Sequence, residues 1–292
     1  MNRSLVALAF ALAAFPLAAQ QDLSKVEIRV HPVAGAVYML QGAGGNIGVS
    51  AGEDGIVIVD DQYAPLAPKI KAALATITDE PVRFVLNTHY HGDHTGGNEI
   101  FGESAPIVAH ENVRKRLAEG VDAPGRRIPP APPAALPVIT FNDRVTVHVN
   151  GEDLRALHVP RAHTDGDSVV FFTRSNVVHM GDLFFSGLFP FIDIDGGGSV
   201  RGLIRGIERV LEKIPPGAKV IPGHGPISDA AGLRGYLEML VATSAAVEKA
   251  LAEGKSAAQM KEEKILAPWD SWSWGFITTD RFIDTLVRDL GE

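Results

Sequence analysis

Residues 87–98 of this chain read NTHYHGDHTGGN. Four side chains that can bind a metal ion stand within six positions of this segment: His89, His91, Asp93 and His94. The apolar residues 82–86 come directly before it and predict a buried strand, so the four side chains lie at the end of a strand and in the turn beyond. Because alternate residues of an extended segment point to one side, His89 and His91 can bind one ion together. Asp93 and His94 follow a turn and can reach a second ion.

The chemistry of these side chains narrows the choice of metal. Neutral imidazoles and a carboxylate suit zinc best, and manganese or iron less well. The chain contains no cysteine, so it offers no thiolate ligand. A polar surface loop is the alternative interpretation, but the dense spacing of the ligands and the strand before them favour a metal site.

Four further segments occur in a recognisable order along the chain. Asp60 ends the apolar run of residues 55–59, and three motifs come later: RAHTDGD at 161–167, MGD at 180–182 and PGHG at 222–225. Together with the histidine segment, they resemble the motifs of the metallo-β-lactamase superfamily of metallohydrolases, over about residues 35 to 230. In that family, the early aspartate usually supports the site from behind the metal ligands.

The resemblance implies an α/β fold, of the α+β kind, and a site for two zinc ions per chain. The implied fold is the four-layer αββα sandwich, in which two packed sheets are flanked by helices. The first zinc would bind His89, His91 and His163. The second would bind Asp93, His94 and His224, and Asp182 would bridge the two ions.

The resemblance also implies a reaction. Two zinc ions can share a hydroxide that attacks a carbonyl at neutral pH without a serine or cysteine nucleophile. Asp93 and Asp182 would then be the catalytic residues. Asp93 would orient the hydroxide or pass a proton to the leaving group, and Asp182 would hold the ions close together.

The residues around Asp182 bear on the substrate. The best-known β-lactamases of the family carry a cysteine at this position and usually a lysine three residues later, where this chain has Phe185. Asp182 instead resembles the thioesterase and lactonase branches, although the tail after His224 does not match the helical substrate domain of the glutathione thioesterases. We expect a β-lactamase-like zinc hydrolase that attacks the carbonyl of a cyclic amide or ester.

Two alternatives stay open at this point. Within the same fold, the protein could be a lactonase, a thioesterase or another esterase. In another class, it could be an iron-dependent sulfur dioxygenase or an accessory protein of a periplasmic redox enzyme. The complete set of second-metal ligands favours hydrolysis over the mononuclear oxygenase.

The start of the chain predicts export. Residues 1–19 contain Arg3, an apolar run at 5–17 and small residues after it, which is the pattern of a signal peptide. The run is shorter than the roughly 20 apolar residues of a membrane-spanning helix. We therefore expect a periplasmic protein with no membrane segment after cleavage. Residues 20–292 would form one metallo-β-lactamase-fold domain with C-terminal helices.

The charge of the chain limits its partners. Its formal net charge is −8, and loss of Arg3 with the signal peptide makes it more negative. Such a surface repels phosphate backbones, and Arg126-Arg127 is the one basic pair that stands out. We expect a small-molecule substrate and no nucleic acid, and the sequence leaves the oligomeric state open.

Hydrophobic periodicity predicts strands, a helix, more strands and then helices, with no internal repeat. The expected strands are residues 26–30, 37–40, 47–50, 56–59, 82–86, 106–109, 145–149, 154–159, 169–173, 177–180 and 219–221. The expected helices are residues 65–77, 95–101, 111–119, 200–214, 233–251, a short one from 256, and 281–290. The glycines at 42, 44 and 48 predict a hairpin turn, because a strand and not a helix follows them.

Residues 120–137 contain six prolines and predict an irregular segment. This segment is either a solvated connector or a lid beside the metals. The histidines outside the motifs are expected to be structural or exposed: His31, His110, His148, His158 and His179. The three tryptophans, Trp269, Trp272 and Trp274, are expected to pack the final segment onto the core, and a substrate wall is the alternative.

Overall fold

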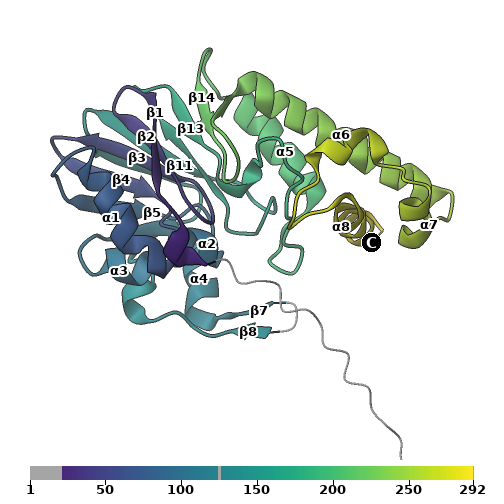
Figure 1. The fold of residues 1–292 in the computed structure, drawn as a ribbon, viewed down its shortest axis with the longest axis horizontal. Coiled ribbons are helices and arrows are strands. Elements are labelled where there is room, and N and C mark those ends of the chain that lie inside the picture. The colour runs from purple at the N-terminus through teal and green to yellow at the C-terminus, as the bar shows by residue number, and fades with distance from the viewer. Residues whose placement is uncertain (1–21, 124–125, 292) are drawn as a thin grey trace, which may run out of the picture.

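The computed structural model describes residues 22–123 and 126–291 (Figure 1). The predicted signal peptide at residues 1–19 lies outside the described residues. Within those described ranges, no helix has both the length and the apolar character that crossing a membrane requires.

A seven-stranded sheet is built from the first half of the chain. In order across the sheet, its strands are β1 (Arg29–Ala34), β2 (Val37–Gln41), β3 (Ile47–Gly52), β4 (Gly55–Val59), β5 (Val82–Leu86), β6 (Ile107–His110) and β9 (Ile139–Phe141). Strands β1 to β4 pair antiparallel, whereas β4, β5, β6 and β9 pair parallel. The carboxyl ends of β4 and β5 therefore meet at one edge, where Asp60 and the histidine segment follow them.

A six-stranded sheet is built from the second half. Its strands are β10 (Arg144–Val149), β11 (Glu152–His158), β12 (Ser168–Phe172), β13 (Val177–His179), β14 (Lys219–Ile221) and β15 (Ser228–Asp229). Neighbours pair antiparallel except β13 and β14, which are parallel. The loop with His163 joins β11 to β12, and the segments with Asp182 and His224 follow the ends of β13 and β14.

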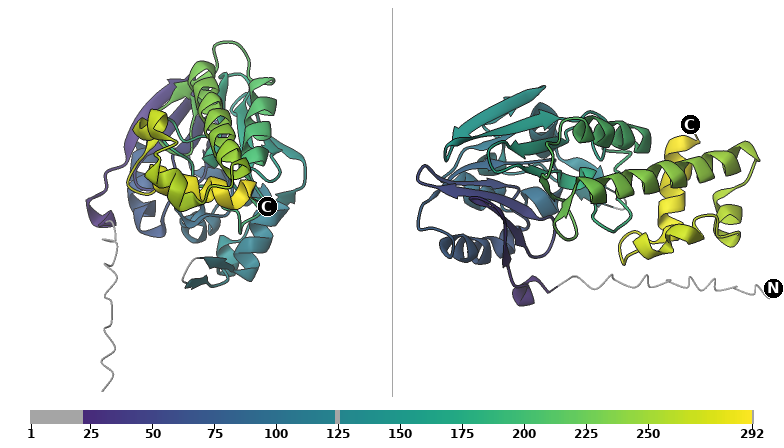
Figure 2. Two further views of the ribbon diagram at one scale, coloured as in Figure 1. Left: turned by 90° about the vertical axis from the view of Figure 1, so that its right-hand side faces the viewer. Right: turned by 90° about the horizontal axis from the view of Figure 1, so that it is seen from above.

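The two sheets pack face to face between two layers of helices (Figure 2). Strand β12 shows how: Val170 and Phe172 lie in the core between the sheets, whereas Val169 and Phe171 lie in the core under the helices. Alternate residues point to opposite faces, so a strand buried on both sides is apolar throughout. The order of helices, sheet, sheet and helices confirms the predicted αββα sandwich.

The helices follow the same division of the chain into two halves. They are α1 (Ala67–Ala75), α2 (Gly92–Thr95), α3 (Asn98–Gly102), α4 (Glu111–Glu119), α5 (Val200–Leu211), α6 (Ala230–Ala252), α7 (Ala257–Glu262) and α8 (Thr279–Leu290). Short 3-10 helices are η1 (Leu23–Lys25), η2 (Ala64–Leu66), η3 (Pro133–Ala135), η4 (Gly181–Leu183) and η5 (Ala267–Trp272).

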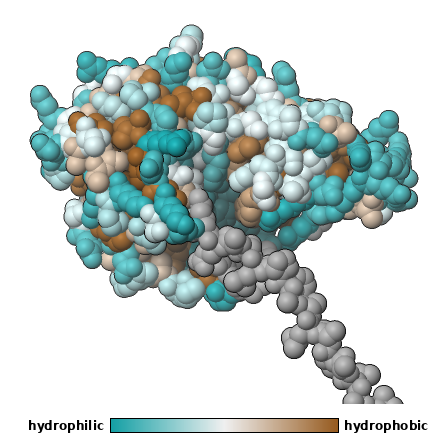
Figure 3. All heavy atoms as spheres, in the orientation of Figure 1, coloured by the Kyte–Doolittle hydropathy of each residue, from teal (hydrophilic) through white to brown (hydrophobic). Residues whose placement is uncertain are grey.

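On the face shown in Figure 3, hydrophilic residues cover most of the α6–α7 end.

The structure differs from the prediction for residues 120–137, which are not irregular throughout. Strands β7 (Val121–Ala123) and β8 (Arg126–Ile128) pair antiparallel. Both strands fall in short runs without proline, so their N–H groups can donate to the partner strand. Strands β9 and β15 were not predicted either.

The final segment packs as predicted. Trp269, Trp272 and Trp274 all lie against the core beneath α6 and α8. The ring of Trp272 is 6.1 Å from that of Tyr236, and the indole nitrogen of Trp274 donates to the carbonyl of Phe189 at 2.9 Å. All three tryptophans therefore pack the final segment onto the core, and Trp274 also lies beside His224, with ring centroids 6.3 Å apart.

Candidate metal centre

The histidine segment starts where β5 ends, and local hydrogen bonds fix its shape. Thr88 follows the strand, and its N–H donates to Oδ1 of Asp60 at 2.7 Å. The carbonyl of His91 accepts the N–H groups of His94 and Thr95, which starts α2 with His91 just before its first turn. The extended part thus presents two histidines and the helical turn presents the next two ligands, as the sequence predicts.

The structure brings all seven predicted ligands together. The ligand atoms of one group lie within 4.8 Å of one another and belong to His89, His91, His163 and Asp182. A second group within the same limit consists of Asp93, His94 and His224. Among the described residues, none of the five remaining histidines belongs to such a group.

Asp182 lies between the two groups and contacts both. Its Oδ2 atom is 3.4 Å from Nε2 of His163 and 3.7 Å from Nε2 of His89. Its Oδ1 atom is 3.1 Å from Nε2 of His94 and 3.4 Å from Nε2 of His224. One oxygen therefore faces each group, which is the geometry that a bridging carboxylate requires.

Three polar atoms of the centre lack a hydrogen-bond partner among the described residues, as expected of atoms that bind a metal. The Nε2 atoms of His89 and His94 and the Oδ1 atom of Asp182 are buried and have no hydrogen-bond partner among the described residues. The 3.1 Å contact between His94 and Asp182 lacks hydrogen-bond geometry. Buried polar atoms without partners are costly, and cations held by the two groups would satisfy all three atoms.

Asp60 holds His94 from behind. Its Oδ2 atom lies 2.7 Å from Nδ1 of His94 and also accepts the hydroxyl of Thr88. A proton on Nδ1 leaves the lone pair of Nε2 directed at the metal position. Asp60 has a φ of +67°, a rare backbone conformation for aspartate that this short connection imposes. The predicted supporting role of Asp60 therefore agrees with its contacts.

Asp193 supports His91 in the same way, and the sequence did not reveal it. Its Oδ2 atom lies 2.8 Å from Nε2 of His91 and accepts the hydroxyl of Tyr90. Nδ1 of His91 then faces the centre, 2.9 Å from Nε2 of His163. Nδ1 of His163 is turned outward to the carbonyl of Phe191 at 2.8 Å. Asp193 is 102 residues from His91, and no motif in the chain marked it.

Close backbone approach explains two glycines beside the centre. A Cβ atom on Gly45 would lie 2.1 Å from Cε1 of His94, and one on Gly223 would lie 2.1 Å from Oδ1 of Asp182. Gly45 belongs to the loop between β2 and β3, which is the predicted hairpin turn. The side chain of Asn46 ties this loop to the His224 loop by donating to the carbonyls of Pro222 and Gly225.

The histidines outside the two groups make other contacts. His179 is fully buried, its Nε2 lies 3.0 Å from the carbonyl of Asn46, and its Nδ1 accepts the N–H of Gly181. His110 and His158 stack on one another with ring centroids 3.7 Å apart. His148 is exposed and pairs with Asp153. These contacts agree with the structural or exposed roles expected for these four histidines.

The charges of the centre divide it into two halves. Burial lowers the pKa of His163 to about 4 and that of His89 well below its usual range. Burial also disfavours the charged form of His224, but the carboxylates of Asp182 and Asp93 outweigh it and raise its pKa to about 9. The same balance, with Asp182 as the largest favourable charge, raises the pKa of His94 well above its usual range.

The two carboxylates of the centre stay ionised. Burial favours the protonated form of Asp93, but His94 and His224 lower its pKa to about 2. The same two histidines keep the pKa of Asp182 well below its usual range despite its burial. Both carboxylates are therefore ready to bind a cation at neutral pH.

Phe185, at the family's lysine position, cannot contact a substrate. Its side chain is 1% exposed and stacks on the ring of His224, with centroids 4.9 Å apart. It fixes the orientation of that ligand from one side. A lysine here would bury an unpaired ammonium beside the imidazole, which is costly.

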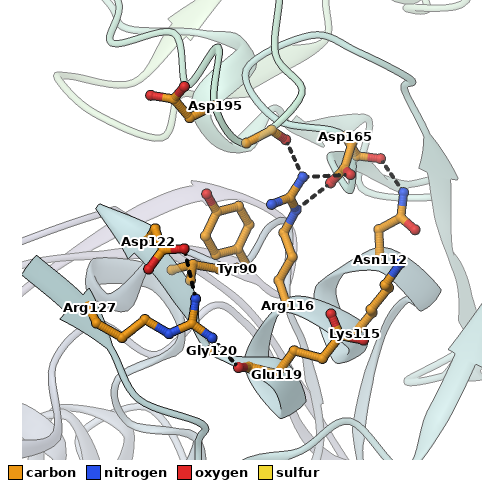
Figure 4. Close-up of a pocket in the computed structure, with 12 residues that line it drawn as sticks. Tyr90, Asn112, Lys115, Arg116, Glu119, Gly120, Asp122, Arg127, Asp165 and Asp195 are labelled. Carbon is orange, nitrogen blue, oxygen red and sulfur yellow. Dashed lines mark hydrogen bonds and ion pairs between the residues drawn. The ribbon is translucent and has the colours of Figure 1, made fainter. Parts of the chain in front are cut away.

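A pocket of about 560 Å³ lies next to the centre and contains none of the seven ligands (Figure 4). The strand pair β7–β8 forms one wall of it, through Val121, Asp122 and Arg127. On the other side, Arg116 donates to both oxygens of Asp165 at 2.7 Å and lies over the ring of Tyr90. The proline-rich segment thus borders a pocket beside the ligands, and its action as a lid stays a prediction.

Comparison with known proteins identifies the family of this chain. A family model described as the metallo-beta-lactamase superfamily matches residues 35–229. The chain belongs to this superfamily. Its members are hydrolases, and the motifs that carried the resemblance all lie within the matched residues.

Solved structures of the superfamily share the fold. A metallo-beta-lactamase from Pontibacter korlensis aligns with a TM-score of 0.61 and 20% identity, over 73% of this chain and 99% of the other. The DIM-1 metallo-beta-lactamase aligns with a TM-score of 0.61 and 19% identity, over 75% of this chain and 100% of the other. These similarities establish the metallo-β-lactamase fold and leave the substrate open.

Several curated relatives are named as enzymes other than β-lactamases. The hydroxyacylglutathione hydrolase of Nitrosococcus oceani is 29% identical over 51% of this chain and 50% of its own length. That of Polaromonas sp. is 28% identical over 56% of this chain and 57% of its own. The 2,4-dinitroanisole O-demethylase subunit alpha of Nocardioides sp. is 25% identical over 53% of this chain and 46% of its own. The chain spans about half the length of these relatives.

Proposed function

We propose that this protein is a dinuclear zinc hydrolase that attacks the carbonyl of a cyclic amide or ester, as a β-lactamase does. The position of Asp182 carries the proposal, because its two oxygens face two separate groups of ligands. We assign His89, His91 and His163 to the first ion and Asp93, His94 and His224 to the second. Asp182 would bridge them.

Zinc ions bound at these ligands would supply a nucleophile at neutral pH and polarise the substrate carbonyl. The chain's own residues prepare for this. Asp60 and Asp193 orient His94 and His91, so that the ligand atoms are set before a metal arrives. Asp93 has a side chain 24% exposed and is ionised, so it can accept a proton on the open side of the centre and deliver it to the leaving group.

A second candidate is hydrolysis of a thioester. Two curated relatives named hydroxyacylglutathione hydrolase support it, at 28% and 29% identity. The aspartate at position 182, in place of the cysteine of the best-known β-lactamases, agrees with this candidate too. Since these relatives match over about half their length, their substrate is a hypothesis for this chain.

We further propose that residues 1–19 are a signal peptide and that the mature chain, residues 20–292, works in the periplasm on a small molecule. The negative net charge supports a partner other than nucleic acid. Expression with a fused reporter at the C-terminus, followed by fractionation and N-terminal sequencing, tests this. A cytoplasmic protein that keeps Arg3 would contradict it.

The substrate proposal is tested by turnover. Zinc-loaded wild type and Asp182→Ala are assayed against a penicillin, an acyl-homoserine lactone, a glutathione thioester and a phosphodiester. Faster hydrolysis of the penicillin, abolished in the variant, supports the first proposal. Faster hydrolysis of the lactone would identify a lactonase instead. Faster hydrolysis of the thioester selects the second candidate. Phosphodiester hydrolysis alone, or no hydrolysis at all, would refute both.

A further inference from the structure

We propose that Phe191, Trp274 and Phe276 form an aromatic wall that binds a flat apolar group of the substrate, next to the carbonyl that is hydrolysed. The inference rests on the proposed function and specifies the class of substrate. Trp274 and Phe276 lie beyond the residues that match the family model, so two of the three rings come from this chain's C-terminal segment, whereas Phe191 lies within the matched residues.

The seven ligands differ in how far they are exposed. Four ligands have side chains at most 5% exposed: His89, His94, His163 and Asp182. The other three are accessible: His91 at 18%, His224 at 16% and Asp93 at 24%. A substrate therefore approaches over His91, which belongs to the first group, and over His224 and Asp93, which belong to the second.

The three aromatic rings run between two of these accessible ligands. The ring of Phe191 lies 5.7 Å from that of His91, and the ring of Trp274 lies 6.3 Å from that of His224. Phe276 connects them, at 5.7 Å from Phe191 and 5.6 Å from Trp274. The rings thus form a continuous arc from a ligand of the first ion to a ligand of the second.

The arc is held rigidly, although Phe276 is 47% exposed. Arg281 stacks on the ring of Phe276, with its guanidinium carbon 4.4 Å from the centroid, and donates to the carbonyl of Phe276 at 2.8 Å. The indole nitrogen of Trp274 is bonded to Phe189, and the carbonyl of Phe191 accepts from His163. Rings fixed in advance lose little entropy on binding.

The chemistry of the arc selects its ligand. Aromatic rings favour other flat apolar groups in edge-to-face or offset contacts at centroid distances of about 4.5–7 Å. An exposed phenylalanine fixed beside reactive groups gains most from a ligand that covers it. We therefore assign the wall to a planar substituent, such as a phenyl ring, on a substrate whose carbonyl lies over His91, Asp93 and His224.

Two thiols test the wall without any turnover. Phenylmethanethiol and ethanethiol carry the same zinc-binding sulfur and differ in the ring. Calorimetric titration of the zinc-loaded protein gives both affinities, for wild type, Phe276→Ala, Phe276→Leu and Trp274→Ala. Val241→Ala on α6 is the matched control, because Val241 is also an apolar side chain 47% exposed. Zinc content is measured for each protein.

The wall predicts that wild type binds phenylmethanethiol about tenfold more tightly than ethanethiol. Phe276→Ala and Trp274→Ala should each remove most of this preference while ethanethiol affinity and zinc content stay unchanged, and Val241→Ala should keep it. Equal affinities in wild type, or a preference retained in both aromatic variants, would overturn the wall. Because binding is measured, a protein that shows the preference but hydrolyses no carbonyl substrate would refute the proposed function alone.

Discussion

The Oδ1 atom of Asp182 lies 3.1 Å from Nε2 of His94, and the two atoms do not share a hydrogen bond. The other oxygen of Asp182 faces His163 at 3.4 Å. A carboxylate that contacts two groups of imidazoles, in a buried place, links the two halves of one centre. The predictions below follow from this link and from the side chains that orient it.

Replacing Asp182 should remove activity and disturb the second ion. Asp182→Ala removes the oxygen that faces each group, so we expect kcat to fall by orders of magnitude and the second ion to be bound poorly. Steady-state kinetics and elemental analysis measure the two effects. Asp284→Ala, an exposed aspartate on α8, is the control. An Asp182→Ala variant with both metals and full activity would show that the bridging role is wrong.

Replacing His224 should affect one ion. His224 belongs to the second group, whereas the first group is complete without it. His224→Ala should therefore lower occupancy of the second ion and leave the first largely intact. Metal content after dialysis is the measurement, with the exposed His148→Ala as its control. Loss of both ions to the same degree would contradict the division of ligands.

Replacing Asp60 should weaken the second ion without removing a ligand. Asp60→Asn keeps the size of the side chain but presents an amide N–H₂ where an oxygen now faces Nδ1 of His94 or Thr88. Changes of this kind lower metal affinity about 10- to 100-fold. Titration of the zinc-loaded Asp60→Asn and wild-type proteins with a zinc chelator measures this difference in metal affinity. Unchanged affinity at both sites would mean that Asp60 is only a packing residue.

Binding of the second ion should release more protons from the protein than binding of the first. In the metal-free protein at pH 7, His94 and His224 carry protons because their pKa values are raised, the second to about 9, whereas His89 and His163 are neutral. Binding at the second group must displace about two protons, so affinity there should fall as the pH falls below 9. Calorimetry in buffers of different ionisation enthalpy counts the protons. Equal proton release at both sites would contradict the prediction.

Much of the centre could be predicted from the sequence because its ligands are local. Four of them lie in one segment after a clearly apolar strand. The extended part of that segment presents His89 and His91, and the turn after it presents Asp93 and His94. His163, Asp182 and His224 are far away in the chain, but each sits in a short motif that contains glycine. Gly223 shows why: a side chain there would collide with Asp182.

The parts that were missed depend on long-range contacts. Asp193 orients His91 across 102 residues, and Asn46 anchors the His224 loop from 176 residues away, through the carbonyl of Pro222. Single aspartates and asparagines in loops are common, so nothing in one sequence distinguishes these two. The β7–β8 pair was missed because prolines surround it, although its own residues contain none.

The number and identity of the bound metals test the central claim most directly. Protein purified after expression with zinc and iron both supplied is analysed for metals by mass spectrometry, with protein concentration from amino-acid analysis. The account predicts two zinc ions per chain, one of them lost in His224→Ala. One iron per chain in the wild type would contradict it.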